Sequence, residues 1–286
     1  MSDAPRERRV GARGLSFRAL EWPGAAPAAL LLHATSFCAD VWRPVWQAAR
    51  ETDSRARGAV AVDQRGHGRS EAPAAASGYA WTELAQDAVE LADALGAPRL
   101  AVGHSSGATA LLAAAGLRPA AFAAVVAVEP VLFEPGGGGF AGGGALAAGA
   151  RRRRARFVSR DEARERLRTR FPYSGFAPDA FEAYLDGALR PTSDGVELCC
   201  PGEREAWCYE GAAALDPWPL AARIAVPLLL VLGERGAVPA ALRDRLLDAR
   251  AGSRVTTIPG ATHFAALERP AEVGRAIGRF ASEVLG

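Results

Sequence analysis

The sequence predicts an α/β domain built on a doubly wound, mostly parallel sheet, with a helical insertion near the middle of the chain. Short apolar runs bounded by turn residues alternate with longer segments of helical periodicity. That alternation favours parallel strands joined by crossover helices. It stops between Val131 and about Arg223, where no strand is expected. At 286 residues the chain has room for one such domain and its insertion.

The expected elements follow one another in strand–helix order. Strands are expected at residues 9–19, 28–33, 59–62, 99–103, 123–128, 227–232 and 254–258. Helices are expected at residues 41–51, 82–95, 106–117, 240–249 and 271–284. The core then comprises residues 1–130 and 223–286, and a helical lid at residues 131–222 is inserted after the strand at residues 123–128. In sheets of this kind the active site lies beyond the C-terminal ends of the strands.

The insertion has two recognisable parts. It opens with a glycine-rich tract at residues 136–144, which is typical of a mobile hinge. A disordered surface loop is the alternative for that tract. The charged run at residues 151–170 follows and reads as a solvated helix. As an alternative, its arginines hold an anionic group of a substrate, such as a carboxylate or a phosphate.

Composition narrows the classes of protein. The net charge is +2, every basic residue is arginine, and nothing favours nucleic acid as a partner. No apolar run reaches the roughly 18 residues of a membrane-spanning helix, and no apolar segment follows the polar start as in a secretory leader. We therefore expect a cytoplasmic protein with a small-molecule substrate and no membrane partner. The four cysteines form no C-x-x-C pair, which predicts free or buried thiols and no metal site.

The strongest functional signal is a serine between two glycines. Residues Gly103-His104-Ser105-Ser106-Gly107 match the pattern G-x-S-x-G, between an apolar strand and a helix-like segment. A sharp strand-to-helix turn strains the backbone at the serine, so the positions two before and two after it must lack bulk. Gly103 and Gly107 meet that demand. The pattern therefore predicts Ser105 as a nucleophile at the end of a strand.

Two backbone N–H groups are expected to form an oxyanion hole beside Ser105. The first belongs to Ser106, because it lies at the positive end of the helix that follows the nucleophile. The second is expected from the loop after the apolar strand at residues 28–33, where Thr35 or Ala34 is the donor. His33 at the start of that loop is expected to hold it in place through its ring nitrogens.

A serine hydroxyl becomes a good nucleophile only when a base accepts its proton, and histidine suits that role near neutral pH. The sequence offers four histidines. His33 and His67 lie in loops where a structural role is expected, and His104 points away from its neighbour Ser105 because alternate residues diverge. His263 remains, in the loop between the last strand and the last helix. A surface histidine is the alternative interpretation there.

Two strand ends offer a carboxylate to orient His263. Glu129 directly follows an apolar strand, and a carboxylate buried there is costly unless it has a partner. Glu234 lies in a more polar turn beside Arg235, where water can solvate it. We favour Glu129 and keep Glu234 as the alternative acid.

Together these residues resemble the α/β-hydrolase superfamily, over nearly the whole chain outside the insertion. The marks of the resemblance are the serine elbow, the His33 loop, the turn at residues 63–70 and the Gly260-x-x-His263 ending. One departure is Ala34, where the family usually has glycine after the histidine. The resemblance implies an α/β-hydrolase fold with a catalytic serine, histidine and acid.

A second departure concerns the acid. The family commonly has Gly-x-x-Asp after the seventh strand, and Gly236 stands at the corresponding position here. The missing aspartate strengthens Glu129. An acid at the end of strand six of the family, here the strand at residues 123–128, is similar to that of zearalenone-type lactone hydrolases and implies a lactonase or esterase. Haloalkane dehalogenases and epoxide hydrolases share the architecture but attack with an aspartate at the elbow, so Ser105 argues against both.

The expected activity is that of a cofactor-free serine hydrolase acting on an ester or lactone of an apolar small molecule. The same groups serve thioesters or a carbon–carbon bond next to a ketone, and a binding or pathway protein without net hydrolysis is a further alternative. The insertion holds many of the aromatic residues, which either line the substrate cleft or pack the lid onto the core: Phe133, Phe140, Phe157, Phe171, Tyr173, Phe176, Phe181, Tyr184, Trp207, Tyr209 and Trp218.

Overall fold

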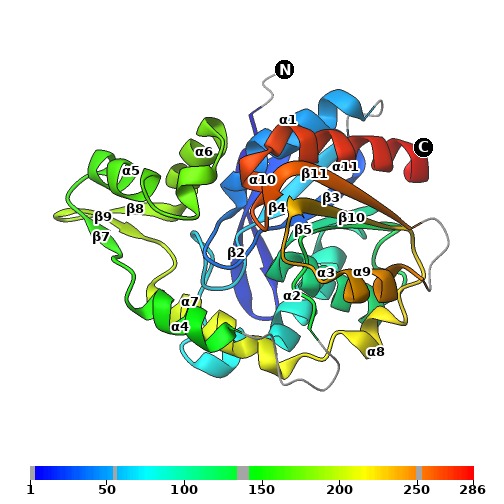
Figure 1. Ribbon diagram of the computed structural model, residues 1–286, viewed down its shortest axis with the longest axis horizontal. Helices are drawn as coiled ribbons and strands as arrows, with labels where there is room; N and C mark the ends of the chain where they lie inside the picture. The colour runs from blue at the N-terminus through cyan, green and yellow to red at the C-terminus, as the bar shows by residue number, and fades with distance from the viewer. Residues whose placement is uncertain (1–3, 54–56, 134–141, 249–252) are drawn as a thin grey trace.

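The computed structural model describes residues 4–53, 57–133, 142–248 and 253–286. Its main sheet has eight strands in the order β1-β2-β4-β3-β5-β6-β10-β11 (Figure 1). All neighbours from β4 to β11 are parallel, and only β1 and β2 at one edge are antiparallel to their neighbours. The predicted doubly wound, mostly parallel sheet is confirmed. The strands are β1 (Arg6–Ala12), β2 (Leu15–Trp22), β3 (Ala25–Leu32), β4 (Arg57–Val62), β5 (Leu100–His104), β6 (Ala124–Val128), β10 (Leu228–Arg235) and β11 (Arg254–Thr262).

The expectation of a single strand at residues 9–19 is wrong, because this segment belongs to a hairpin of two strands. β1 and β2 pair antiparallel, with Ala12 opposite Leu15. The two residues between them, Arg13 and Gly14, have φ of 49° and 72°. Two successive positive φ angles are what a two-residue hairpin turn of the I′ type needs. The glycine was the signal in the sequence, and the flanking apolar residues masked it.

Helices cover both faces of the sheet (Figure 1). On one face α1 (Trp42–Thr52) and α11 (Pro270–Leu285) form a core with Leu31, Val102 and Val126. On the other face α2 (Trp81–Ala94), α3 (Ser106–Leu117) and α9 (Ala240–Leu247) contribute to a second core that contains Leu30 and Leu32. Successive strand residues thus serve opposite cores, which is why these strands read as continuous apolar runs. The short helix α10 (Ala265–Glu268) precedes α11.

The insertion between β6 and β10 contains helices and a small sheet. Its helices are α4 (Gly143–Arg151), α5 (Arg160–Arg168), α6 (Pro178–Ala188), α7 (Gly202–Glu210) and α8 (Trp218–Ala221). The expectation of no strand is wrong, because β7 (Arg156–Phe157), β8 (Leu189–Thr192) and β9 (Gly195–Leu198) form a three-stranded antiparallel sheet in the order β7-β9-β8. Ser193 and Asp194 join β8 to β9, and Pro191 is tolerated because β8 is an edge strand.

Two further expectations concern residues of this insertion. The charged run at residues 151–170 is not one helix, because β7 interrupts it between the end of α4 and the start of α5. Most of the glycine-rich tract that was expected to be a hinge, and Phe140 with it, lies outside the described residues. In Figure 1, β7, β8 and β9 lie with α5 and α6 to one side of the core, and α4 lies beside α7. Below, the segment from α4 to α7 is called the cap.

All four cysteines lie in the described part of the chain, where they are buried and free of disulfides. Across the same residues, none of the helices combines the length and the apolar character that crossing a bilayer requires.

Candidate active site

A strained turn presents Ser105 between β5 and α3. Its φ is 53° and its ψ is −119°, a conformation that is unfavourable for a residue with a side chain. A Cβ at Gly103 would lie 2.5 Å from the Cα of Ala108, and a Cβ at Gly107 would lie 2.5 Å from the carbonyl oxygen of His33. The turn therefore needs both glycines for the reason expected from the sequence.

His263 joins Ser105 to Glu129. Its Nε2 lies 2.9 Å from Oγ of Ser105, and its Nδ1 lies 3.2 Å from Oε2 of Glu129. An ionised carboxylate only accepts, so Nδ1 carries the hydrogen and Nε2 is free to accept from the serine hydroxyl. The three side chains follow β5, β11 and β6, at the C-terminal edge of the parallel strands.

Glu129 is completely buried directly after β6. Its Oε1 accepts the N–H of Gly233 at 2.8 Å, and its Oε2 accepts the N–H of Ala237 at 3.0 Å. With His263, these groups provide three donors to a carboxylate whose burial would otherwise be costly. The acid thus belongs to the end of β6, while the backbone around the end of β10 holds it.

Gly236 makes the room for this carboxylate. A Cβ at Gly236 would lie 1.9 Å from Oε1 of Glu129. The position at which the resemblance led us to look for an aspartate therefore has no side chain, and the carboxylate of Glu129 lies against it. Glu234, the alternative acid, is exposed, and its Oε2 accepts the N–H of Gly260 at 2.8 Å. Of the two carboxylates, the structure brings Glu129 to His263.

The loop expected to complete an oxyanion hole lies against the start of α3. The N–H of Thr35 donates to Oγ of Ser106 at 2.9 Å, and the two hydroxyls are 3.0 Å apart. Ala34 accepts the N–H of Phe37 through its carbonyl oxygen at 3.1 Å. Thr35 and Ser106 are therefore neighbours, as expected, but the Thr35 N–H points at the Ser106 hydroxyl rather than at open space.

The other three histidines are buried in structural hydrogen bonds. Nε2 of His33 accepts the N–H of Gln64 at 2.9 Å, and Nε2 of His67 accepts the N–H of Ser36 at 3.1 Å. His104 bonds through Nε2 to the carbonyl oxygen of His263 at 2.9 Å. Burial lowers the pKa of all three rings, to about 4 for His67 and about 3 for His104. They are neutral at pH 7 and hold loops, which leaves His263 as the ring that contacts Ser105.

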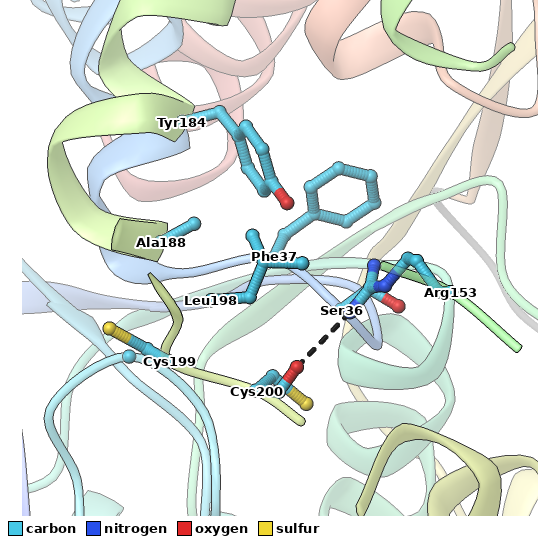
Figure 2. A pocket seen from close by; sticks show the side chains of 9 residues that line it. Ser36, Phe37, Arg153, Tyr184, Ala188, Leu198, Cys199 and Cys200 are labelled. Carbon is cyan, nitrogen blue, oxygen red and sulfur yellow. Dashed lines mark hydrogen bonds between the residues drawn. The ribbon is translucent and has the colours of Figure 1, made fainter. Parts of the chain in front are cut away.

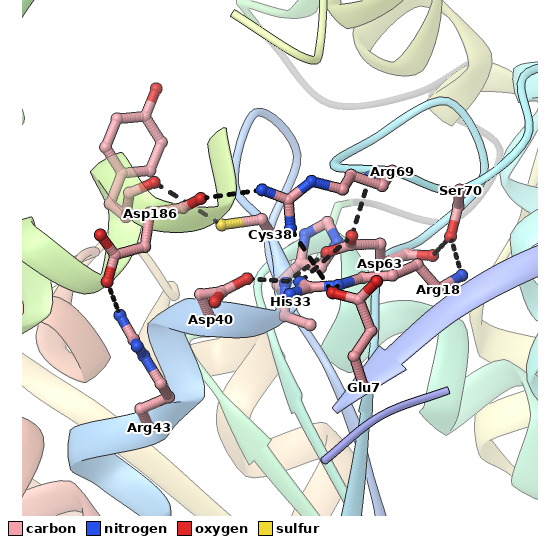
Figure 3. Close-up of polar contacts among 12 residues, drawn as sticks. Glu7, Arg18, His33, Cys38, Asp40, Arg43, Asp63, Arg69, Ser70 and Asp186 are labelled. Carbon is pink, nitrogen blue, oxygen red and sulfur yellow. Dashed lines mark hydrogen bonds and ion pairs between the residues drawn. The ribbon is translucent and has the colours of Figure 1, made fainter. Parts of the chain in front are cut away.

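The turn at residues 63–70 is part of this scaffold (Figure 3). Asp63 is fully buried, and it accepts the N–H of Ala39 at 2.7 Å and the N–H of Arg69 at 2.9 Å. Arg18 lies between Asp63 and Asp40 and forms ion pairs with both. Burial nevertheless raises the pKa of Asp63 to about 6. The network ties the loop after β3 to the turn after β4.

Aromatic side chains of the cap mostly pack it onto the core. Phe176 and Tyr184 are buried, with ring centroids 5.8 and 5.6 Å from that of Phe37. Phe171 is the exception, because it is 76% exposed, and its ring contacts Phe264 next to His263. Packing of the cap, one of the two expectations for these residues, therefore accounts for most of them. The ring of Phe264 thus contacts the exposed Phe171 on one side and the buried Phe37 on another, with centroids 5.6 and 6.2 Å away.

Sequence reasoning did not single out two charged residues that reach this region from the cap. Arg153 lies between α4 and β7, and Glu205 lies on α7. A signal for Glu205 was present, since it is three residues before Cys208 and so shares the apolar face of that helix. Nothing in the charged run distinguished Arg153 from its neighbours.

Comparison with known proteins gives the family. A model described as "Alpha/beta hydrolase family" matches residues 29–276. The chain belongs to the alpha/beta hydrolase family. The solved structure of E-2-(acetamidomethylene)succinate hydrolase is 27% identical with a TM-score of 0.81, and the match covers 96% of this α/β-hydrolase and 98% of that chain.

Two other relatives limit what can be inferred from the similarity. A Caballeronia sordidicola protein named epoxide hydrolase is 38% identical over 121 residues, which make up 42% of this chain and 36% of that protein. This α/β-hydrolase therefore spans little more than a third of that relative. The enol-lactonase from Burkholderia xenovorans LB400 is 21% identical with a TM-score of 0.72, covering 96% of this chain and all of that one, and it shows the fold alone.

Proposed function

We propose that this protein is a serine hydrolase that cleaves an ester or lactone through an acyl-enzyme. One observation carries the proposal: Ser105, His263 and Glu129 are linked by contacts of 2.9 and 3.2 Å at the C-terminal edge of the sheet. Hydrolysis is also the reaction named for the structure at 27% identity, which acts on an acetamidomethylene succinate. The acid after strand six is the arrangement that resembles zearalenone-type lactone hydrolases.

The steps follow from the roles of the three side chains. Nε2 of His263 takes the hydroxyl proton of Ser105 as Oγ attacks the carbonyl carbon. Glu129 accepts from Nδ1 and stabilises the imidazolium. Collapse of the tetrahedral intermediate breaks the bond to the leaving alkoxide, which takes the proton from Nε2. Water then attacks the acyl-enzyme with His263 as base again, releasing the acid and regenerating Ser105.

The oxyanion of each tetrahedral intermediate needs donors. We assign the first to the N–H of Ser106, at the start of α3, where the helix dipole favours negative charge. The second is the N–H of Thr35, which becomes available when the Ser106 hydroxyl turns away from its present 2.9 Å contact. The hole is then completed during binding of the substrate.

The identity of the nucleophile distinguishes the proposed reaction from the activity named for one relative. Epoxide hydrolases of this architecture attack with a carboxylate, and the resulting alkyl ester is opened by water. A serine ether would resist that second step, because no acyl carbon is present for water to attack. Ser105 therefore favours acyl transfer, and the relative's printed activity is not carried over to this chain.

A fluorophosphonate probe tests the nucleophile directly. We expect the folded protein to be labelled on Ser105, and the Ser105→Ala variant to remain unlabelled. Absence of labelling in protein with native circular dichroism contradicts the proposal. A panel of p-nitrophenyl esters, macrolactones and p-nitrophenyl thioesters then identifies the preferred acyl group, and turnover of thioesters alone would replace the ester or lactone assignment.

A further inference from the structure

A narrow pocket lies where the cap meets the candidate oxyanion loop (Figure 2). Ser36 and Phe37 line it from the core, and Arg153, Tyr184 and Cys200 line it from the cap. As the side chains stand, the pocket has no room for a water molecule. A ligand group therefore enters only by replacing a side-chain contact or by a small movement of the cap.

Arg153 differs from the other arginines of the run in its burial. Its side chain is 18% exposed, compared with 37% for Arg151, 47% for Arg154 and 80% for Arg156. The exposed arginines pair with glutamates on the surface, where such ion pairs contribute little to stability. A guanidinium in a buried pocket is costly unless all its donors are used.

The donors of Arg153 are only partly used. Nη2 lies 2.6 Å from Oε2 of Glu205 and donates to the carbonyl oxygen of Cys200 at 3.1 Å, and Nη1 donates to the Tyr173 hydroxyl at 3.3 Å. Nε is buried and has no hydrogen-bond partner among the described residues. A guanidinium presents its donors as a planar fork that matches the two oxygens of a carboxylate.

Glu205 connects this arginine to the catalytic region. It is 6% exposed, and its Oε1 accepts from the hydroxyls of Ser36 and Tyr209. Ser36 has a positive φ of 78° and directly follows Thr35, whose N–H contacts Ser106. Only the short segment from Thr35 to Ser36 separates the Arg153–Glu205 pair from the start of α3.

We propose that Arg153 binds a carboxylate of the substrate through donors that include its unpartnered Nε, while Glu205 stays paired with the same guanidinium. This inference rests on the proposed serine hydrolase function and names its substrate class: an ester or lactone that carries a carboxylate a few bonds from the scissile carbonyl. The substrate carboxylate shares the guanidinium with Glu205, which keeps its bonds to Ser36 and Tyr209. Phe37 contributes the apolar wall between the two ends of the substrate.

The test compares charged and neutral forms of one substrate series. The probes are p-nitrophenyl half esters of succinate, glutarate and adipate, each paired with its methyl ester, and the readout is the ratio of kcat/KM for acid over methyl ester. At the favoured length, Arg153→Met should lower this ratio by about tenfold to a hundredfold, since hydrogen bonds to charged groups are strong. Exposed Arg152 supplies a control, because Arg152→Met changes the net charge equally and should leave the ratio unchanged.

Glu205→Gln distinguishes a carboxylate-binding site from a structural ion pair by the direction in which the ratio of kcat/KM changes. Removing the competing charge should raise the acid preference severalfold, so the Arg153 and Glu205 variants move the ratio in opposite directions. A merely structural pair would lower kcat/KM for both substrates alike in both variants, and that result overturns the proposal. The same holds if the wild-type protein shows no acid preference at any chain length.

A binding measurement separates this inference from the nucleophile assignment. Calorimetry of Ser105→Ala protein with the dimethyl and monomethyl esters of the same three diacids measures binding affinity without turnover. Tighter binding of the monomethyl acid, lost in Ser105→Ala/Arg153→Met, supports the carboxylate site even if Ser105 fails to label. Equal binding of both forms, or no loss with Arg153→Met, overturns it even if Ser105 labels normally.

Discussion

Replacing Gly236 by alanine should disable the proposed triad although none of its three residues is replaced. The new Cβ would lie 1.9 Å from Oε1 of Glu129, so the carboxylate must retreat by about 1.5 Å to reach the 3.4 Å of an ordinary contact. The hydrogen bond from His263 Nδ1 is already 3.2 Å long and cannot survive that movement. We expect kcat to fall by about 10²- to 10⁴-fold, as when the acid of a triad no longer orients its histidine.

The assay is steady-state hydrolysis of the best p-nitrophenyl ester from pH 5 to 9, together with the rate of fluorophosphonate labelling. Gly149→Ala is the matched control, because Gly149 is an exposed residue of α4 and its Cβ would meet nothing within 4 Å. Urea unfolding checks that Gly236→Ala remains folded. A kcat within threefold of wild type, with an unchanged pH profile, would refute the reasoning.

Two other predictions follow from the buried groups. Glu129→Gln should lower kcat by about a thousandfold or more while Glu234→Gln leaves it within about threefold, and the reverse result would make Glu234 the acid. The pKa of His104 is lowered to about 3 by burial, so the unfolded chain binds a proton that the folded chain does not, and stability is lost as pH falls below about 6.5. His104→Gln should therefore flatten the dependence of the free energy of unfolding on pH between 4 and 6 by about 1.4 kcal/mol per pH unit, measured by urea titration; an unchanged slope would contradict the assignment of His104 as neutral.

Local sequence constraints predicted the parts of the fold that depend on a few neighbouring residues. The serine elbow was readable because its geometry demands two glycines at fixed spacing, and those glycines are irreplaceable in the structure. The buried parallel strands were readable because they face two cores and are apolar throughout. Glu129 was favoured over Glu234 on the cost of burying a carboxylate, and the structure brings that residue to His263.

Other features depend on contacts between distant residues, which one sequence does not reveal. The cap sheet was missed because its strands are two to four residues long and their periodicity is too brief to recognise. Arg153 looked like its neighbours because the groups that it contacts, Tyr173 and Glu205, lie far from it in the sequence. The direction of the Thr35 N–H was equally hidden, since it is set by the hydroxyl of Ser106.

The end of β10 and the loop after it hold Glu129 through backbone groups rather than through side chains. The N–H groups of Gly233 and Ala237 donate to its two carboxylate oxygens, so this support needs no particular side chain. Bulk is excluded at Gly236 by that carboxylate, and at Gly233 by the carbonyl oxygens of Ala261 and Thr262, each 2.5 Å from where a Cβ would lie. A search for an acidic residue after the strand that corresponds to β10 would pass over proteins of this kind, whereas a glycine at that position combined with a glutamate after the counterpart of β6 would find them.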